Sequence, residues 1–183
     1  SSRLVASVAI LDGETLVAEY TLNYKKTHSQ TLLPMLDEIV KMTELDLDTI
    51  DAIAIASGPG SFTGLRIGSA TAKGLGLALK KPLVEVPTLV GLAYNLCGTE
   101  GLICPIMDAR RGQVYTGIYA CADNELKVME EQMAVPIEEL AEKLSVSRQA
   151  VAKWKSGQVY PEITNLIQIS NLLDAGSAEV FCT

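Results

Sequence analysis

The chain contains a single histidine, His28, and few aromatic side chains, which make up 5% of its 183 residues. One histidine excludes a metal site that needs two. A Ser-His-Asp triad would have to use His28, and no nucleophile-elbow motif accompanies it. We therefore expect no catalytic residue and no metal ligand in this chain. With so few aromatics, small aliphatic side chains must form most of the core, which suits a protein of helices and sheets.

The cysteines are few, widely separated and without a CxxC pair: Cys97, Cys104, Cys121 and Cys182. This spacing is typical of reduced thiols in a cytosolic protein, so we expect free cysteines and a cytoplasmic location. No signal segment and no apolar run long enough to span a bilayer occurs, so no membrane contact is expected. A chain of this length buries enough surface to fold without a disulfide or metal.

Clustered positive charge is also missing, since the formal net charge is −7. Binding to phosphate backbones depends on grouped Lys and Arg side chains. A bulk attraction to nucleic acid is therefore not expected, and any contact with RNA would be local or made through a partner.

What the sequence does contain is an alternation of strand and helix patterns. Asp12-Gly13 is a favoured two-residue hairpin turn between two strand-like segments. Strand patterns occupy residues 3–11, 15–22, 52–56, 82–86, 102–107, 113–119 and 125–130. Helical patterns occupy residues 27–42, 61–79, 88–96 and 136–144. This order predicts an α/β fold with a mixed sheet and flanking helices.

Residues 57–76 join the end of a predicted strand to a long predicted helix. Ser61 or Thr63 is suited to cap that helix, and Gly58 and Gly60 precede it. Backbone N–H groups at such a helix start can approach an anion closely. These residues are therefore a candidate anion or nucleotide loop, although the Gly-Lys-Ser/Thr of a Walker loop is missing.

Small residues recur every four positions within this helix: Gly64, Gly68, Ala72 and Gly76. They leave one helix edge nearly free of side chains, against a propensity penalty of about 1 kcal/mol for each glycine. The edge could pack on the protein's own sheet, or it could receive a helix of another protein. We expect the second, a protein–protein interface.

Residues 57–76, SGPGSFTGLRIGSATAKGLG, closely resemble the signature of the TsaB (YeaZ) family, accessory proteins of tRNA threonylcarbamoyladenosine synthesis. Three further stretches agree: His28-Ser29 with residues 32–36, residues 86–89, and residues 108–115. The resemblance covers about residues 1–144.

The resemblance implies an actin-like (ASKHA, ribonuclease H-like) fold and a non-catalytic scaffold. Such a scaffold pairs with a paralogous metal-dependent ATPase, which transfers threonylcarbamoyl to adenosine in tRNAs reading codons that begin with A. ATP and the metal ion would belong to that partner, tRNA would be met through the complex, and the chain alone would form a homodimer. By the same resemblance, two helices form the pairing surface, here through His28, Leu32, Met35, Gly64, Gly68, Ala72 and Gly76.

The sequence departs from the family pattern at its start. The family's apolar first strand, central to the sheet and ending in Asp-Thr-Ser, has no counterpart before residue 3. Its absence would leave backbone groups unpaired, unless residues 178–182 replace it. We expect an actin-like subdomain over residues 1–98 that lacks this strand, and a partial second subdomain over residues 99–144.

The last part of the chain departs as well. Residues 137–173 resemble the helix-turn-helix of Cro/repressor-like (XRE) regulators, so residues 145–183 form a predicted helical tail. On that resemblance, Ser147, Arg148, Gln149 and Lys153 would face DNA. The alternative function is thus a DNA-binding regulator. Two further possibilities stay open: the helices cap the second subdomain, or the chain is a fusion.

Overall fold

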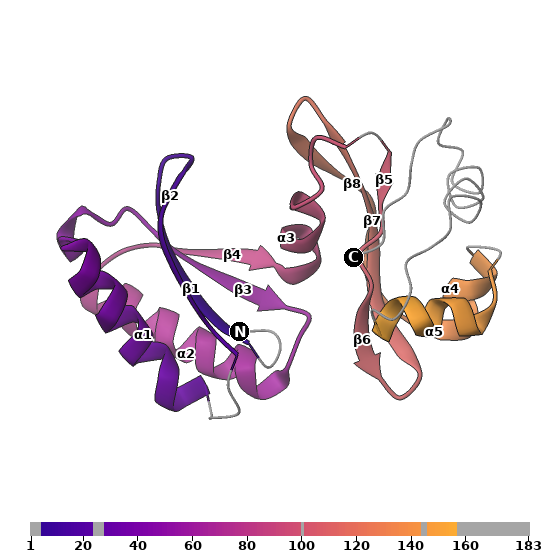
Figure 1. Cartoon of the computed structure of the whole chain (residues 1–183), viewed down its shortest axis with the longest axis horizontal. Coiled ribbons are helices and arrows are strands. Elements are labelled where there is room, and N and C mark those ends of the chain that lie inside the picture. Colours follow the sequence, from indigo (N-terminus) through magenta and orange to yellow (C-terminus); the bar gives the residue numbers. More distant parts are fainter. Residues whose placement is uncertain (1–4, 24–27, 100, 144–145, 157–183) are drawn as a thin grey trace. The chain divides into compact units, whose positions relative to one another are not determined.

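The computed structural model describes residues 5–23, 28–99, 101–143 and 146–156 (Figure 1). The chain divides into two compact units, residues 1–88 (unit 1) and 89–183 (unit 2). No helix among the described residues is long and apolar enough to cross a membrane.

Unit 1 begins with a hairpin and a helix and continues with a strand–helix–strand unit. Its elements are β1 (Ala6–Asp12), β2 (Thr15–Leu22), α1 (His28–Thr43), the 3-10 helix η1 (Leu47–Thr49), β3 (Ile53–Gly58), α2 (Phe62–Leu79) and β4 (Leu83–Pro87). The predicted elements of this half are confirmed, with ends shifted by a few residues.

The hairpin turns where the sequence predicts it. β1 and β2 pair antiparallel, with Asp12 opposite Thr15, and Gly13 adopts the left-handed φ of +56° that glycine favours. β3 and β4 pair parallel, and α2 is the crossover helix between them. Parallel neighbours need such a crossover, because a short turn cannot return the chain to the same end of the sheet.

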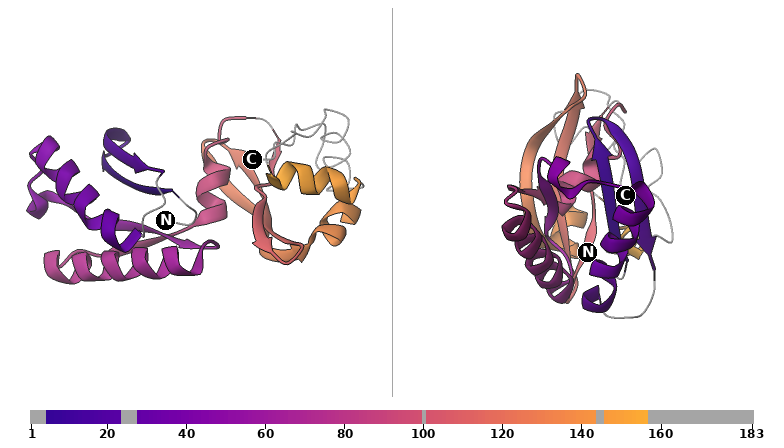
Figure 2. Two further views of the ribbon diagram at one scale, coloured as in Figure 1. Left: turned by 60° about the horizontal axis from the view of Figure 1, so that its bottom comes forward. Right: turned by 90° about the vertical axis from the view of Figure 1, so that its left-hand side faces the viewer.

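The strand layer of unit 1 is divided. Among the described residues, β1 pairs with β2 and β3 pairs with β4, and no ladder joins the two pairs. The helix layer is continuous, because α1 contacts the hairpin, α2 contacts β3 and β4, and the two helices contact each other (Figure 2). Residues 178–182, the predicted substitute for the family's first strand, lie outside the described residues.

Unit 2 is built on a four-stranded antiparallel sheet with helices packed against it. Its elements are most of α3 (Thr88–Tyr94), then β5 (Leu102–Ile103), β6 (Met107–Arg110), β7 (Gln113–Ala122), β8 (Glu125–Pro136), α4 (Ile137–Lys143) and α5 (Arg148–Ser156). β7 is the organising strand: it pairs with β8 along its length, with β6 near its start and with β5 near its end.

Two apolar clusters make up the core of unit 2. One joins α3 to the sheet through Leu89, Ala93, Ile103, Met107 and Tyr119. The other joins α4 and α5 to the sheet and contains Leu102, Cys104, Ile106, Val114, Ile118, Val135, Ile137, Leu140, Ala141 and Val151.

These clusters explain where the units divide. Because α3 packs within unit 2, the division falls at residues 88 and 89, earlier than the predicted boundary at 98 and 99. The described part of the predicted tail, α5, shares a core with the sheet instead of standing apart, since Val151 is fully buried there.

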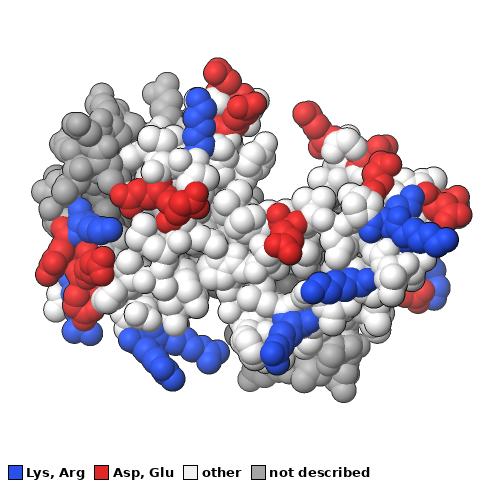
Figure 3. Space-filling view, turned by 180° about the vertical axis from the view of Figure 1, so that it is seen from behind, with Lys and Arg blue, Asp and Glu red and all other residues white. Residues whose placement is uncertain are grey.

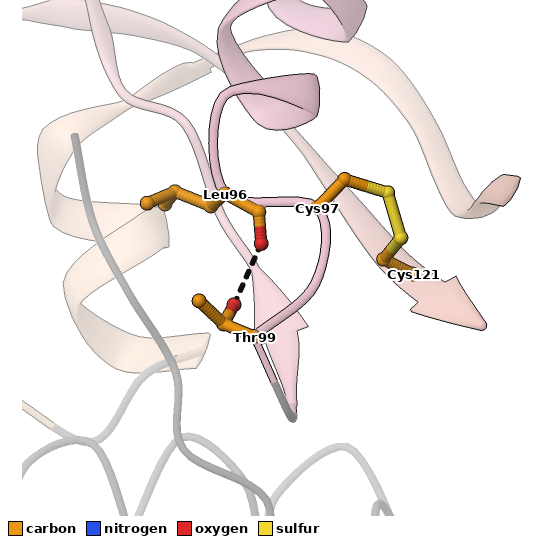
Figure 4. Close-up of a disulfide and its surroundings, with 4 residues drawn as sticks. All are labelled: Leu96, Cys97, Thr99 and Cys121. Atoms are coloured by element: carbon orange, nitrogen blue, oxygen red, sulfur yellow. Dashed lines mark hydrogen bonds between the residues drawn. A yellow bond between two sulfur atoms is a disulfide. The ribbon is translucent and has the colours of Figure 1, made fainter. Parts of the chain in front are cut away.

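The expectation of free cysteines is wrong at two positions. Cys97 and Cys121 form a disulfide across 24 residues of sequence (Figure 4). Their spacing gave no hint of this, because β7 and the segment after α3 bring them together only in the folded chain. Cys104 is a buried free cysteine, and Cys182 lies outside the described residues.

Candidate functional site

The start of α2 is built as the sequence predicts. Ser61 is the N-cap, and its Oγ accepts a hydrogen bond from the N–H of Gly64 at 3.4 Å. A serine in this position satisfies one of the N–H groups that every helix start leaves unpaired. Ser61 is therefore the cap, and Thr63, the alternative, is an exposed residue of the first turn.

Gly58 lies where only glycine fits easily. Its φ is +114°, a region that residues with a side chain rarely adopt. A Cβ added there would also meet Leu65 Cδ1 at 3.3 Å. The proposed anion loop (Gly58, Gly60, Ser61 and Thr63) thus has a sound structural reason for its small residues, and anion binding by it stays a prediction.

A shallow hollow of about 320 Å³ lies against this segment. It is lined by Ile55, Ala56, Ser57, Phe62, Leu65, Arg66, Ser69 and Glu85. Arg66 is the cation of this lining and Glu85 its carboxylate, and the Arg66 guanidinium sits 4.3 Å from the ring centre of Phe62. Because the lining carries both charges, it offers no net attraction to an anion.

The small-residue edge of α2 faces inward. Gly64, Gly68, Ala72 and Gly76 are all buried within unit 1, where α2 packs on β3 and against α1. A Cβ added at Gly76 would lie 2.9 Å from Leu83 Cδ2 and 3.2 Å from the carbonyl oxygen of Lys81. The expected mechanism, in which a partner docks on bare backbone here, needs correction, because the protein's own strands already occupy this edge.

The α1 residues predicted for the interface are also inward. Leu32 and Met35 are buried together with Ile39, on the face of α1 that packs into unit 1. His28 is the first residue of α1, and its side chain lies outside the described part of the structure. These residues position the helices, so a second molecule would meet other side chains.

The outward side chains of the two helices include large apolar groups. Phe62 is 69% exposed, Leu77 84% and Met42 75%, and Leu33 is exposed as well. We call the exposed side of α2 that carries Phe62 and Leu77 the outer helix face. Leu33 and Met42 are nine residues apart on α1, so they point to opposite sides of that helix. On α2, Phe62, Arg66, Lys73 and Leu77 share one side of the helix, since the spacing of four, seven and four residues follows the helical period. These apolar positions are visible in the sequence, but the predicted interface followed the small residues of α2, which the structure buries.

The residues proposed to face DNA have roles within unit 2. The Oγ of Ser147 accepts a hydrogen bond from the N–H of Ala150 at 3.1 Å, at the start of α5. Arg148 Nε lies 2.8 Å from Glu138 Oε1 of α4. Gln149 and Lys153 are exposed. Because α4 and α5 pack together on the sheet, the structure favours the possibility that these helices cap the second subdomain.

On the face shown in Figure 3, acidic and basic side chains are interspersed around uncharged surface. Phosphate binding needs positive charge concentrated along a groove or helix. This face of the molecule gives no such concentration.

Three titratable groups among the described residues have shifted pKa values. Hydrogen bonds from Thr21 and Ser7 hold the pKa of Glu19 below its usual value. A hydrogen bond to Asp37 raises the pKa of Lys41. Burial raises the pKa of Tyr119. None of these groups belongs to residues 57–76, and the described residues contain no group of three His, Cys, Asp or Glu side chains suited to a metal ion.

Comparison with known proteins decides the family. The family model of TsaD, tRNA N6-adenosine threonylcarbamoyltransferase, matches residues 15–174. The chain belongs to this family. Within the family it is a TsaB/YeaZ relative, as residues 57–76 indicated. The match to the family model also spans α4 and α5.

Two curated relatives show how far the similarity extends. TsaB of Bacillus subtilis (strain 168) is 41% identical over 119 residues, which cover 65% of this chain and 52% of that protein. TsaB of Escherichia coli (strain K12) is 37% identical over 131 residues, which cover 70% and 56%. Both relatives are named tRNA threonylcarbamoyladenosine biosynthesis proteins. The chain thus spans about half the length of these relatives.

A solved structure agrees on the fold. YeaZ from Pseudomonas aeruginosa superposes with a TM-score of 0.68 at 31% identity, covering 74% of this chain and 64% of that one. The actin-like mixed α/β fold expected from the sequence is confirmed.

Proposed function

We propose that this chain is a non-catalytic accessory subunit in the synthesis of threonylcarbamoyladenosine in tRNAs that read codons beginning with A. It acts by pairing with a paralogous metal-dependent ATPase of the same family, which carries out the transfer. ATP and the metal ion are bound by that partner, and tRNA is met through the complex. The chain pairs with itself when the partner is missing, and it works in the cytoplasm.

The observation that carries this proposal is the membership of the TsaD family on the TsaB side, together with the names of the TsaB relatives. The single histidine, His28, leaves this chain without the pair of histidines that a His-based metal site of a catalytic subunit requires. A pair of paralogues accounts for the family membership and for the single histidine. In such a pair one chain contains the reaction centre, and the other shares its fold without that centre.

The outer helix face is the proposed pairing surface. It consists of the exposed side of α2 around Phe62 and Leu77. Exposed apolar side chains of this size lose contact with water when a partner covers them, which stabilises a complex by about 25 cal/mol per Å² of apolar surface. Aromatic and methionine side chains are enriched at the centres of protein interfaces.

The buried residues that the sequence predicted for the interface contribute to pairing indirectly. Leu32 and Met35 fill the space beneath α1, and the small residues of α2 let that helix lie close to β3 and α1. They therefore fix the spacing and angle of the two helices, and so the shape that a partner meets.

The test is a pull-down with the purified paralogous ATPase, followed by threonylcarbamoyl transfer to a tRNA transcript with and without this chain. We expect a stoichiometric complex and transfer that rises when the chain is added. The chain alone should show no transfer. Transfer by the isolated chain would refute the non-catalytic role, and an ATPase that neither binds the chain nor responds to it would refute the accessory role.

A further inference from the structure

We infer that Cys97 and Cys121 are a reversible thiol–disulfide pair that exchanges with small-molecule thiols and disulfides of the glutathione type. When closed, the pair fastens the segment after α3 to the end of β7; when open, it releases that segment. The inference rests on unit 2 alone and does not depend on the proposed function.

Each cysteine is held in place by bonds other than the disulfide. Cys121 is fixed by its ladder position opposite Leu126 of β8. The N–H of Cys97 donates to the carbonyl oxygen of Tyr94 at 3.0 Å, which extends the last turn of α3. The Cα atoms are 5.2 Å apart, within the range that a disulfide requires. Because these bonds are local to the end of α3 and to the β7 ladder, they bring the two cysteines back within reach of each other after reduction, so the disulfide can re-form.

The pair is accessible to a small reagent. Cys97 and Cys121 are both only partly buried. A hollow of about 450 Å³ opens beside them, lined by Gly98, Thr99, Cys121, Asp123 and Asn124. Exchange requires a thiolate to reach a disulfide sulfur, so access is a condition for reversibility. Cys104 provides the contrast: it is buried, and its Sγ shares a hydrogen bond with Thr116 Oγ1 at 3.3 Å.

The exchange needs one co-reactant, an oxidised small-molecule disulfide such as glutathione disulfide. One cysteine of the pair, as its thiolate, attacks that disulfide, forms a mixed disulfide and releases one reduced glutathione. The second cysteine then attacks the mixed disulfide at the protein sulfur and releases the other. The protein loses two electrons and two protons, and glutathione disulfide becomes two reduced glutathiones, so atoms and electrons balance.

The segment that the bond fastens has the means to move. Gly98 has a φ of +100° and Gly101 a φ of +121°, conformations that leave the chain easy to redirect. Thr99 donates from its N–H and its Oγ1 to the carbonyl oxygen of Leu96, at 3.1 and 2.7 Å (Figure 4). These local bonds keep the turn compact, and the disulfide attaches it covalently to β7 beside the packing of Leu96 on the core cluster.

The core cluster beneath the disulfide is made of other buried residues, and Leu96 and Cys121 pack against its edge. Ile103 and Tyr119 are buried in the cluster that also holds Leu89 of α3. Opening the disulfide therefore frees a surface segment and leaves the sheet of unit 2 folded, which is the behaviour of a local switch.

The experiment is a titration of the full chain in glutathione buffers from fully reduced to fully oxidised. A Cys182→Ser background removes the cysteine outside the described residues. Acid quenching, alkylation and intact-mass measurement report the thiols, and hydrogen exchange reports the backbone. We expect Cys97 and Cys121 to lose their thiols together in one two-electron transition, while Cys104 stays reduced. Exchange at residues 96–99 should rise about tenfold on reduction, with the middle of β7 unchanged.

Matched variants separate the outcomes. Cys97→Ser should abolish the two-electron transition and leave Cys121 carrying one glutathione under oxidising conditions, with the exchange pattern of the reduced chain. Cys104→Ser should titrate like the parent. Thiols at 97 and 121 that persist in fully oxidised buffer, that titrate separately, or whose oxidation leaves exchange at residues 96–99 unchanged would overturn the inference.

Discussion

Unit 2 buries its apolar side chains, whereas unit 1 leaves many of them in solvent. In unit 2 the described residues form two apolar clusters on a single sheet, with helices packed against it. In unit 1 the buried apolar side chains are few: Ala6, Leu32, Met35, Ile39 and Ala72. Exposed large apolar residues are concentrated in unit 1: Leu11, Leu16, Val17, Tyr20, Leu33, Met42, Leu47, Phe62, Leu77, Leu83 and Val84.

The difference follows from how the strands are joined. β7 links every strand of unit 2, so its sheet presents a continuous surface for α3, α4 and α5. The strands of unit 1 form two separate pairs, so the helices cover a layer that is itself divided. A layer that does not bury its apolar face against another contributes little to stability. Unit 2 should therefore supply most of the chain's folding free energy, and unit 1 should hold the surface available to a partner.

The strongest test of this comparison removes a core side chain from unit 2. Leu89→Ala should lower the free energy of unfolding by about 2–5 kcal/mol, because Leu89 is fully buried and the loss leaves a cavity. Chemical denaturation followed by circular dichroism measures the change. Leu77→Ala in unit 1 is the matched control and should shift stability by less than about 0.5 kcal/mol. Equal losses in free energy of unfolding for the two variants would contradict the claim that unit 2 supplies most of the stability.

A second prediction concerns the closed loop in unit 2. Cys97→Ser should reduce the stability of oxidised unit 2 by about 3 kcal/mol, the loss expected when a loop closed across 24 residues is opened. The same substitution should have almost no effect in reducing buffer. Denaturation curves in both buffers give the comparison. A loss of equal size in the two buffers would show that the serine disturbs packing and that the bond does not matter.

A third prediction distinguishes two glycines of α2. Gly76→Ala should cost about 1 kcal/mol net, because the new Cβ meets Leu83 Cδ2 at 2.9 Å and the Lys81 carbonyl at 3.2 Å. Gly74→Ala should stabilise the helix by up to about 1 kcal/mol, because nothing lies within 4 Å of its Cβ and alanine favours helix. Thermal unfolding of both variants measures the pair. Stabilisation by both would mean that the small-residue edge is not closely packed.

The smallest expected effect is a pH dependence in the hairpin of unit 1. The folded pKa of Glu19 lies below the usual 4.5, because Thr21 and Ser7 donate hydrogen bonds to its carboxylate at 2.6 and 3.1 Å. The stabilisation is thus present above pH 4.5 and lost as the pH falls through the folded pKa. Glu19→Gln should slightly reduce the loss of hairpin stability at acid pH, which NMR spectra of β1 and β2 recorded over a pH series would measure. If the variant loses hairpin stability at acid pH as the parent does, carboxylates other than Glu19 cause that loss.

Local signals predicted most of the fold. The Asp12-Gly13 turn, the Ser61 cap and the alternation of strands with helices depend on residues near one another, so the sequence displayed them. The division of the strand layer into two pairs was not predicted, because the pattern of elements indicated one mixed sheet. The sequence could not show which neighbour would cover the small-residue edge of α2, because packing on β3 and packing on a partner demand the same small side chains.

Tertiary proximity accounts for what the sequence could not decide. Cys97 and Cys121 have no motif spacing, and only the fold of unit 2 brings them together. Ser147 and Arg148 matched a DNA-reading pattern, but the same residues cap a helix and pair with Glu138. A helix-capping serine followed by an arginine suits both roles, so the packing of α5 on the sheet was needed to choose between them.

The most direct test of the account measures affinity for the paralogous ATPase. The double variant Phe62→Glu with Leu77→Glu changes only exposed side chains of unit 1, and Met129→Glu is the matched change at an exposed apolar residue of unit 2. By calorimetry, with folding confirmed by circular dichroism, the double variant should weaken binding at least about 30-fold, since two interface anchors that each contribute about 1 kcal/mol or more together contribute about 2 kcal/mol. Met129→Glu should bind as the parent does. Unaltered affinity in the double variant would contradict the claim that unit 1 presents the pairing surface.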